Sequence, residues 1–250
     1  MTRSTRPGTL YLIPTNLGEP IQTHAILPAG VIEAVSHLEY FIVENAKTAR
    51  KFLKAVGIKI PLQSLDMREL NEHTPTSELP GLLQPVLHGI DAGLLSEAGA
   101  PAVADPGAAL VALAHAAGVA VAPLVGPSSL LLALMASGLN GQSFAFHGYL
   151  PADREGRIIV IADLERESAR RSMTQMCIET PYRNNALLAD LLDTCSSETR
   201  ICIATNLTAS DQSIVTRRVA EWRKAIPDIN RKPTVFLMLA AGMPARKKRD

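Results

Sequence analysis

Aromatic residues are scarce in this chain and make up only 4% of its 250 residues. Such a low content argues mildly against a protein that binds single-stranded nucleic acid by stacking successive bases on aromatic rings. Cysteine is scarce too. The three cysteines, Cys177, Cys195 and Cys202, form no CxxC pair and have no metal-ligand spacing. A small, odd number of cysteines is typical of a reducing compartment, so we expect a cytoplasmic protein.

Several functional signatures are also missing. The scattered histidines form no HExxH motif, and the sequence predicts no metal site. Residues 1–7 lack the apolar segment of a signal peptide. The apolar zone at residues 107–139 is interrupted by Gly118 and Pro123, and no run in it approaches the ~20 residues that cross a bilayer. We therefore expect no membrane association, and we assign the zone to buried helices and a strand.

Charge gives only a mild indication of a partner. The net charge is +1, so no overall field favours nucleic acid or membrane, and an apolar content of 47% favours a globular protein. Residues 1–150 hold 8 Lys/Arg and 11 Asp/Glu, whereas residues 151–250 hold 17 and 13. The positive second part suits an anionic partner, and an ordinary solvated surface is the simpler explanation.

Short apolar runs alternate with helical patterns in the first half of the chain. This alternation predicts βαβ units and a parallel sheet. Asp105 and Pro106 would be the N-cap and first residue of the helix at 108–117. The expected strands lie at residues 10–13, 40–43, 62–65, 93–96 and 119–122.

The second half alternates less regularly, so its sheet is expected to be mixed. Residues 123–127 are rich in proline and glycine and read as a linker, which gives domains at 1–123 and 124–250. The expected strands of the second domain lie at 143–146, 176–178, 201–204 and 233–239, and its helices at 129–137, 154–170, 183–194 and 217–225. The overall expectation is an α/β protein of two domains.

Two loops carry the strongest functional indication. Residues 96–107 read SEAGAPAVADPG, and residues 126–129 read GPSS. Each follows an expected strand and precedes an expected helix, and open α/β sheets place their ligands at the carboxyl ends of strands. The two loops therefore predict a backbone-lined pocket for a small polar molecule.

Three further loops follow expected strands. Residues 14–18 occupy the place of a nucleotide loop but lack GxGxxG and the P-loop lysine, which disfavours a dehydrogenase or NTPase. Glu44 begins a helix, where it either interacts with the helix dipole or faces a substrate. Residues 179–184 offer Tyr182 to line a pocket and Arg183 to contact an anion, or they simply begin a helix at Pro181.

Taken in order, these motifs resemble the tetrapyrrole methylase superfamily of S-adenosylmethionine-dependent methyltransferases. The ordered set is residues 96–107, 126–129, 137–151 and 179–183, and the resemblance spans residues 8–239. Within the superfamily the chain looks most like the bacterial branch that includes the 16S ribosomal RNA cytidine 2′-O-methyltransferases. The resemblance implies two α/β domains, an N-terminal parallel sheet and a C-terminal mixed sheet, with the cofactor in the cleft between them. It also implies a homodimer.

The chemistry of methyl transfer to a ribose hydroxyl suggests three catalytic candidates, Glu44, Lys47 and Arg183: Glu44 would be the base for the hydroxyl, and Lys47 or Arg183 would hold a phosphate. The resemblance itself implies the cofactor contacts. S-adenosylmethionine would lie against Pro14, Leu17, Gly18, Ser96, Glu97, Ala98, Gly99, Val103, Ser128, Ser129, Tyr182, Asn206 and Thr234.

Two departures from the branch keep the acceptor open. Where the branch reads Ser-Asp-Ala-Gly-Thr-Pro, this chain has Glu97 and Ala100, and where it reads Glu-Asp-Thr-Arg, this chain has residues 44–47, ENAK. Lysine does not reproduce the bidentate fork of arginine. The acceptor is therefore ribosomal RNA, or a small molecule such as a tetrapyrrole carbon in a sibling enzyme. A non-catalytic protein that binds the cofactor or a partner is the alternative from another class.

Overall fold

The computed structural model describes residues 6–18 and 23–242. The chain divides into two compact units, Met1–Ser128 and Ser129–Asp250. Each unit has its own sheet and its own buried core.

The sheet of the first unit has five parallel strands in the order β3-β2-β4-β1-β5. The parallel sheet expected from the alternating pattern is therefore confirmed. Every residue of the central strands β2 and β4 is buried, which is why both read as uninterrupted apolar runs. The bounds are β1 Thr9–Ile13, β2 Tyr40–Val43, β3 Asp66–Glu69, β4 Ala92–Leu95 and β5 Ala120–Pro123.

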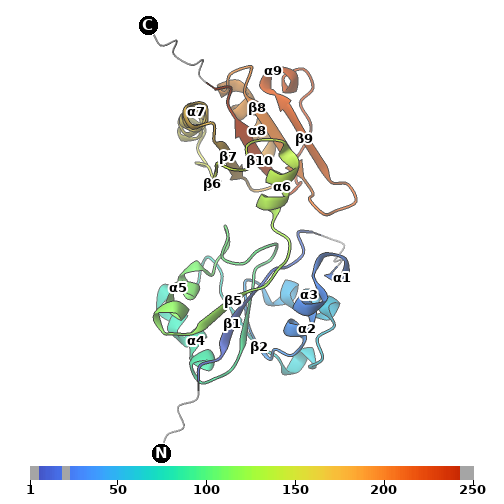
Figure 1. Ribbon diagram of the computed structural model, residues 1–250, viewed down its shortest axis with the longest axis vertical. Coiled ribbons are helices and arrows are strands. Elements are labelled where there is room, and N and C mark those ends of the chain that lie inside the picture. Colours follow the sequence, from blue (N-terminus) through green and yellow to red (C-terminus); the bar gives the residue numbers. More distant parts are fainter. Residues whose placement is uncertain (1–5, 19–22, 243–250) are drawn as a thin grey trace, which may run out of the picture. The chain divides into compact units, whose positions relative to one another are not determined.

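Helices cover both faces of this sheet (Figure 1). One apolar cluster joins the sheet to α4 and α5 through Leu83 and Leu110, and a second joins it to α2 and α3 through Val35 and Phe52. The helices are α1 Thr23–Ile26, α2 Ala29–Ser36, α3 Ala46–Val56, α4 Leu79–Leu87 and α5 Ala108–Ala116. This two-sided cover leaves the carboxyl ends of the strands, with their loops, as the place for a ligand.

Two expectations for the first unit are wrong. Residues 62–64 form a 3-10 turn, and the strand β3 follows at Asp66–Glu69. That strand was missed because it is a largely exposed edge strand of charged residues, without an apolar pattern. Asp105 does not cap α5, because the helix begins at Ala108 after Gly107, and no side chain caps it.

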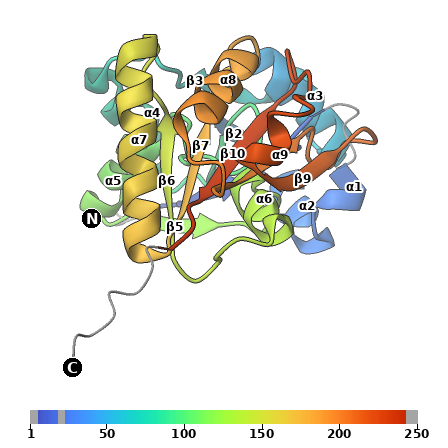
Figure 2. The same ribbon diagram turned by 90° about the horizontal axis from the view of Figure 1, so that it is seen from above.

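The sheet of the second unit is mixed, as expected. Its order is β6-β7-β10-β8-β9; β6 and β7 are parallel, and the other three pairs are antiparallel. Helix α7 packs against β7 and β10, and α9 packs against β9 (Figure 2). The bounds are β6 Phe144–Tyr149, β7 Thr174–Ile178, β8 Arg200–Thr205, β9 Ser213–Arg218 and β10 Thr234–Leu239, with α6 Ser129–Ser137, α7 Arg154–Arg171, α8 Asn184–Thr194 and α9 Val219–Trp222.

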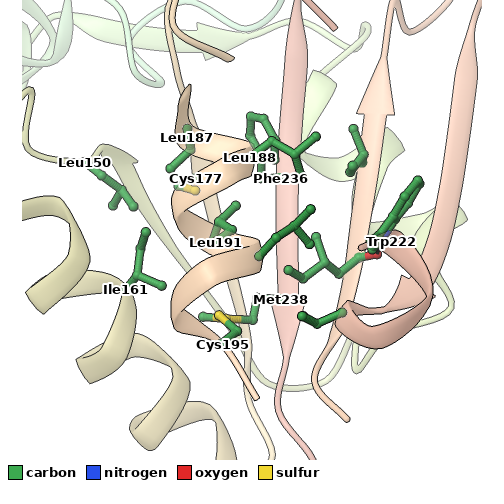
Figure 3. Close-up of a cluster of buried hydrophobic side chains, with 14 of the residues drawn as sticks. Leu150, Ile161, Cys177, Leu187, Leu188, Leu191, Cys195, Trp222, Phe236 and Met238 are labelled. Atoms are coloured by element: carbon green, nitrogen blue, oxygen red, sulfur yellow. Dashed lines mark hydrogen bonds between the residues drawn. The ribbon is translucent and has the colours of Figure 1, made fainter. Parts of the chain in front are cut away.

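The core of the second unit lies between α7, α8 and the sheet. Leu188 and Leu191 of α8 face Phe236 and Met238 of β10 (Figure 3). The expectation of a helix at 217–225 is wrong at residues 217 and 218, which belong to a strand. Residues 213–218 form the edge strand β9, and only four residues of helix follow. The run Ser-Ile-Val-Thr at 213–216 has the β-branched composition of a strand, which the sequence reading passed over.

A buried ion pair anchors the start of α7 to α8. Arg157 and Asp190 have side chains only 7% and 4% exposed, with 2.6 Å between Nη2 and Oδ2. Arg157 also donates to the carbonyls of Pro151 and Ala152, and Arg154 donates to the other oxygen of Asp190. Nearly every polar atom of the pair is satisfied, as burial of charge requires.

Among the described residues, no helix is long and apolar enough to cross a membrane. The same residues contain no cluster of three histidine, cysteine or acidic side chains arranged to hold a metal ion. All three cysteines are free and buried.

Candidate functional site

Three loops of the first unit meet at the carboxyl ends of β1 and β4. The Thr15 N–H donates to the Gly99 carbonyl at 2.9 Å, and the Gly99 N–H donates back to the Thr15 carbonyl at 3.2 Å. Gly99 has a φ of +76°, which favours glycine. This two-way bridge fixes residues 14–18 against residues 96–99.

The third loop is held by close backbone packing. A Cβ added to Gly126 would lie 2.2 Å from Cγ of Pro14 and 2.6 Å from its Cβ. Only glycine therefore allows the segment at 126–128 to lie against the first loop. A Cβ added to Gly99 would lie 3.8 Å from the Pro127 carbonyl oxygen, so all three loops are neighbours. The structure thus brings Pro14, Gly99 and the segment before Ser129 together.

An acidic group lies beside these loops. Glu44 accepts a hydrogen bond through Oε2 from the backbone N–H of Glu97 at 2.9 Å. The hydroxyl of Thr48 lies 3.5 Å from Oε1 of Glu97. Burial, and then the charge of Glu44, raise the pKa of Asp105 to about 6; Glu97 adds to this effect and the Ser96 side chain partly offsets it. Glu44 therefore positions the loop at Glu97, and burial together with the neighbouring carboxylates holds the pKa of Asp105 above its ordinary value.

Asn45 accounts for one departure from the branch pattern. Its side chain accepts hydrogen bonds from the N–H groups of Lys47 and Thr48 and so caps α3. Asparagine and aspartate cap helices about equally well, so this position keeps its local structural role without an acid. The next departure, Lys47, is exposed.

A pocket of about 140 Å³ opens between the loop at 14–18, the first turns of α3 and Glu97. Asn16 lines it and is only 7% exposed. Neither Oδ1 nor Nδ2 of Asn16 has a hydrogen-bond partner in the part of the chain that the structure describes. The lining residues are Thr15, Asn16, Leu17, Gly18, Thr48, Lys51, Phe52, Glu97 and Ala98.

The second unit carries its own group of candidate residues after β7. Oε1 of the buried Glu179 accepts from the Thr180 N–H at 2.6 Å and from Arg183 Nη2 at 2.7 Å. Arg183 is thus paired with a carboxylate. Tyr182 is 74% exposed, and the Arg231 guanidinium lies 5.7 Å from the centre of its ring.

The side chains of Asn184 and Thr234 contact each other at the start of α8 and of β10. The Asn184 amide donates to the Lys232 carbonyl at 2.6 Å and to the Thr234 hydroxyl at 3.2 Å. Asn206 follows β8 with a φ of +49°, and its amide donates to Asp211 at 2.7 Å. Thr234 and Asn206 start from adjacent strand ends, because Thr234 pairs with Thr205 in the β8–β10 register.

The candidate residues therefore fall into two groups. In the first unit, the loops that carry Pro14, Leu17, Gly18, Ser96, Glu97, Ala98, Gly99 and Ser128 meet, with Glu44 beside them, while Val103 has an exposed side chain. In the second unit, Tyr182, Arg183, Asn206 and Thr234 follow the ends of β7 and β8 or begin β10. Ser129 begins α6.

Sequence reasoning did not single out five lining residues of the pocket: Thr15, Asn16, Thr48, Lys51 and Phe52. Three of them follow the i, i+3, i+4 spacing of one helical face, which is the signal that could have found them. Asn16 lies within a loop that the sequence did highlight, but nothing in the pattern indicates that its side chain is buried without a partner.

Both units offer polar atoms suited to a nucleoside cofactor. Oε2 of Glu179 and Oδ1 of Asn184 are buried and lack partners among the described residues. Buried acceptors of this kind are costly unless a donor reaches them, and ribose hydroxyls and an amino group are such donors. The first unit adds closely packed backbone at Gly99 and Gly126. Taken separately, each unit therefore offers groups that suit part of a nucleoside cofactor such as S-adenosylmethionine.

The fold matches solved methyltransferase structures. The crystal structure of the methyltransferase CobJ aligns with a TM-score of 0.63 at 19% identity, covering 94% of this chain and 95% of that one. Uroporphyrin-III-C-methyltransferase from Thermus thermophilus aligns with a TM-score of 0.54 at 18% identity, covering 93% and 92%. The architecture is therefore the two-domain α/β methylase fold.

Sequence comparison identifies the family. No protein-family model matches the sequence. The ribosomal RNA small subunit methyltransferase I of Vibrio cholerae is 32% identical over 93% of this chain and 77% of its own length. Its counterpart from Micromonospora olivasterospora is 31% identical over 95% and 71%. The chain belongs to the ribosomal RNA small subunit methyltransferase I family and is a methyltransferase.

Proposed function

We propose that this enzyme transfers a methyl group from S-adenosylmethionine to a ribose hydroxyl of small-subunit ribosomal RNA. The observation that carries the proposal is the 32% identity to a ribosomal RNA small subunit methyltransferase I across 93% of the chain. A similarity of that length includes the loops of both units. The likeness to tetrapyrrole enzymes lies below 20% identity and concerns the fold alone.

The proposed cofactor contacts are those that the resemblance assigns. In the first unit they are Pro14, Leu17, Gly18, Ser96, Glu97, Ala98, Gly99, Val103 and Ser128, and in the second Ser129, Tyr182, Asn206 and Thr234. The meeting of three loops in the first unit supports the former set. The unpartnered acceptors of Glu179 and Asn184 support the latter. When bound, the cofactor supplies a methyl group already activated by the sulfonium.

The main task of the protein is then alignment, which explains why no strong acid–base triad is needed. We propose that Glu44 takes the proton of the acceptor hydroxyl. Its Oε2 is held by the Glu97 N–H, and this bond orients the carboxylate while Oε1 accepts the proton. Lys47 is exposed at the start of α3 and suits a phosphate of the RNA backbone. The Arg183 guanidinium already donates to the Glu179 carboxylate, so it would contact such a phosphate while keeping that ion pair.

A homodimer in the cytoplasm completes the proposal. Helix α6 leaves Met135 80% exposed and Leu131 55% exposed, and apolar side chains of this size favour a protein contact. Light scattering coupled to size-exclusion chromatography measures the mass directly, and a monomer at micromolar concentration would contradict the dimer.

The test of the function uses the purified full chain with methyl-labelled S-adenosylmethionine and small ribosomal subunits from a strain that lacks this enzyme. The expected result is label in small-subunit RNA, in a nucleotide that resists alkaline cleavage because its 2′-hydroxyl is blocked. Label in a tetrapyrrole precursor but not in RNA would instead support a sibling enzyme. Tight binding of S-adenosylhomocysteine without transfer to RNA or precursor would support a non-catalytic protein.

A further inference from the structure

Helix α3 carries a concentration of positive charge on one face. Lys47, Arg50, Lys51 and Lys54 are all exposed, and their i, i+3, i+4 and i+7 spacing places them on the same side of the helix. Residues 1–150 contain eight Lys/Arg against 11 Asp/Glu, so half of these cations lie on this single face. The helix itself contains no acidic residue. We call the four residues the α3 stripe.

The charge of the α3 stripe is not balanced within the protein. The ion pairs formed by the part of the chain that the structure describes include none of its four residues. Like charges three and four residues apart destabilise a helix, and Lys47 lies in the first turn, where the helix dipole disfavours a cation. The arrangement therefore costs stability in the free protein, and a bound polyanion would offset that cost.

The shape of the α3 stripe indicates which polyanion it suits. Its charges follow one another at about one helical turn, roughly 5.4 Å, over a length of about 10 Å. A row of this kind matches the regularly spaced phosphates of a nucleic acid strand better than a single small anion. The large apolar side chains of α3, Phe52, Leu53 and Val56, are all buried, so the helix has no apolar face to insert into a membrane surface.

The α3 stripe begins beside the candidate site of the first unit. Lys47 follows Glu44, the proposed base, by three residues. Lys51 lines the same pocket as Glu97. Because β2 and β3 are parallel, α3 runs back from the carboxyl ends of the strands, so Lys54 is the member of the stripe furthest from the loops.

We propose that the α3 stripe binds successive phosphates of the RNA strand that flanks the reacting nucleotide, so that this strand leaves the site along the outer face of α3. The proposal rests on the proposed function, since it takes the substrate to be RNA. It extends the phosphate contact proposed for Lys47 to a track of four cations. These contacts are sequence-independent, and they hold the strand in place without reading its bases.

The first experiment measures binding of a fluorescein-labelled single-stranded RNA to the full chain as a function of salt concentration. The variant Arg50→Gln/Lys54→Gln removes the two cations of the stripe that lie outside the site and its pocket. Each phosphate contact to a single strand contributes about 0.7 to the slope of log K against log salt, so the slope should fall by about 1.4. At about 0.15 M salt the same change corresponds to roughly tenfold weaker binding. Equal slopes in the variant and the wild-type chain would overturn the proposal.

A matched pair of arginines on α7 controls for charge. Arg166 and Arg170 are exposed and have the same i, i+4 spacing, but they pair with Asp163 and Glu167. Arg166→Gln/Arg170→Gln removes the same charge and should leave the salt slope unchanged. Equal falls in both variants would show a general charge effect and refute the stripe. Binding to phosphatidylserine vesicles is measured in parallel. If the α3 variant loses vesicle binding but keeps wild-type RNA binding, the stripe serves a membrane and the proposal is overturned.

The unfolding temperature of the free protein separates a binding role from a structural one. Arg50→Gln/Lys54→Gln reduces the repulsion along α3 and should raise the unfolding temperature while it weakens RNA binding. A lowered unfolding temperature would show that the stripe stabilises the fold and would overturn the proposal.

Methyl transfer to small ribosomal subunits completes the test. The α3 variant should raise KM for the subunits about tenfold, while kcat and the affinity for S-adenosylhomocysteine stay at wild-type values, because the stripe contacts RNA away from the reacting atoms. A lowered kcat with unchanged KM would contradict a role in holding the flanking strand. Absence of transfer by the wild-type chain refutes the proposed function, whereas transfer with an unchanged KM in the variant refutes only the stripe.

Discussion

The packing of Gly126 against Pro14 predicts that replacing Gly126 with alanine lowers the free energy of unfolding. The same replacement at Gly81, which has no close neighbour, should raise it. In Gly126→Ala the new Cβ would lie 2.2 Å from Cγ of Pro14 and 3.0 Å from Cδ2 of Leu27, well inside ordinary contact distance. The Pro14 ring is fixed to the backbone and does not rotate away. The loop must therefore shift, at a cost of about 1–3 kcal/mol, as for other overpacked sites.

Gly81→Ala is the control. Gly81 lies in the exposed part of α4, and a Cβ there meets nothing within 4 Å. Alanine in a helix is more favourable than glycine by roughly 0.5–1 kcal/mol, so this variant should be stabilised.

The assay is urea unfolding of both variants together with calorimetric binding of S-adenosylhomocysteine. Gly126→Ala should lower the unfolding midpoint and weaken cofactor binding at least tenfold, because the loop that it moves borders the proposed cofactor residues. Gly81→Ala should leave binding unchanged. An unchanged midpoint and unchanged binding in Gly126→Ala would refute the reasoning that the loops at 14–18 and 126–128 are packed as described.

Three further predictions concern single side chains. Asp190→Ala leaves the buried Arg157 unpaired and should cost about 3–5 kcal/mol in chemical unfolding, and a cost below 1 kcal/mol would contradict the buried pair. Asn45→Ala removes the cap of α3 and should cost about 1 kcal/mol, whereas Asn45→Asp should cost little, and equal losses would exclude capping. Asp105 has a pKa raised from 3.8 to about 6, so its ionisation opposes folding as pH rises through this range. Asp105→Asn should therefore stabilise the protein at pH 8 by about 1 kcal/mol, after a discount for partial exposure, and progressively less as pH falls from 6 to 4; a gain independent of pH would show another cause.

The sequence predicted the parts of the fold that depend on apolar patterning. The runs at β2 and β4 are buried on all sides and were recognisable as strands from composition alone. The edge strand β3 was missed because its charged, largely exposed residues form no apolar run. The edge strand β9 was missed although its Ser-Ile-Val-Thr run has the β-branched composition of a strand. Helix capping was also misjudged at Asp105, where proline and glycine delay the start of α5 until Ala108.

The site was predictable at the level of loops and not of side chains. The positions of the loops at 96–107 and 126–129 after expected strands predicted that the two would share a pocket, and the loop at 14–18 joined them only through the family resemblance. That Asn16 is buried without a partner, or that Asn45 caps a helix, depends on packing between segments far apart in the chain. The ion pair of Arg183 with Glu179 forms within the loop between β7 and α8, so the helical spacing rule does not predict it.

The most direct measurement is transfer of labelled methyl groups from S-adenosylmethionine to unmodified small ribosomal subunits, followed by mapping of the labelled nucleotide. The account predicts label at a 2′-hydroxyl of the small-subunit RNA, reduced at least a hundredfold by Glu44→Gln as expected for loss of a general base. Absence of label in that RNA, in a preparation that binds S-adenosylhomocysteine, would contradict it.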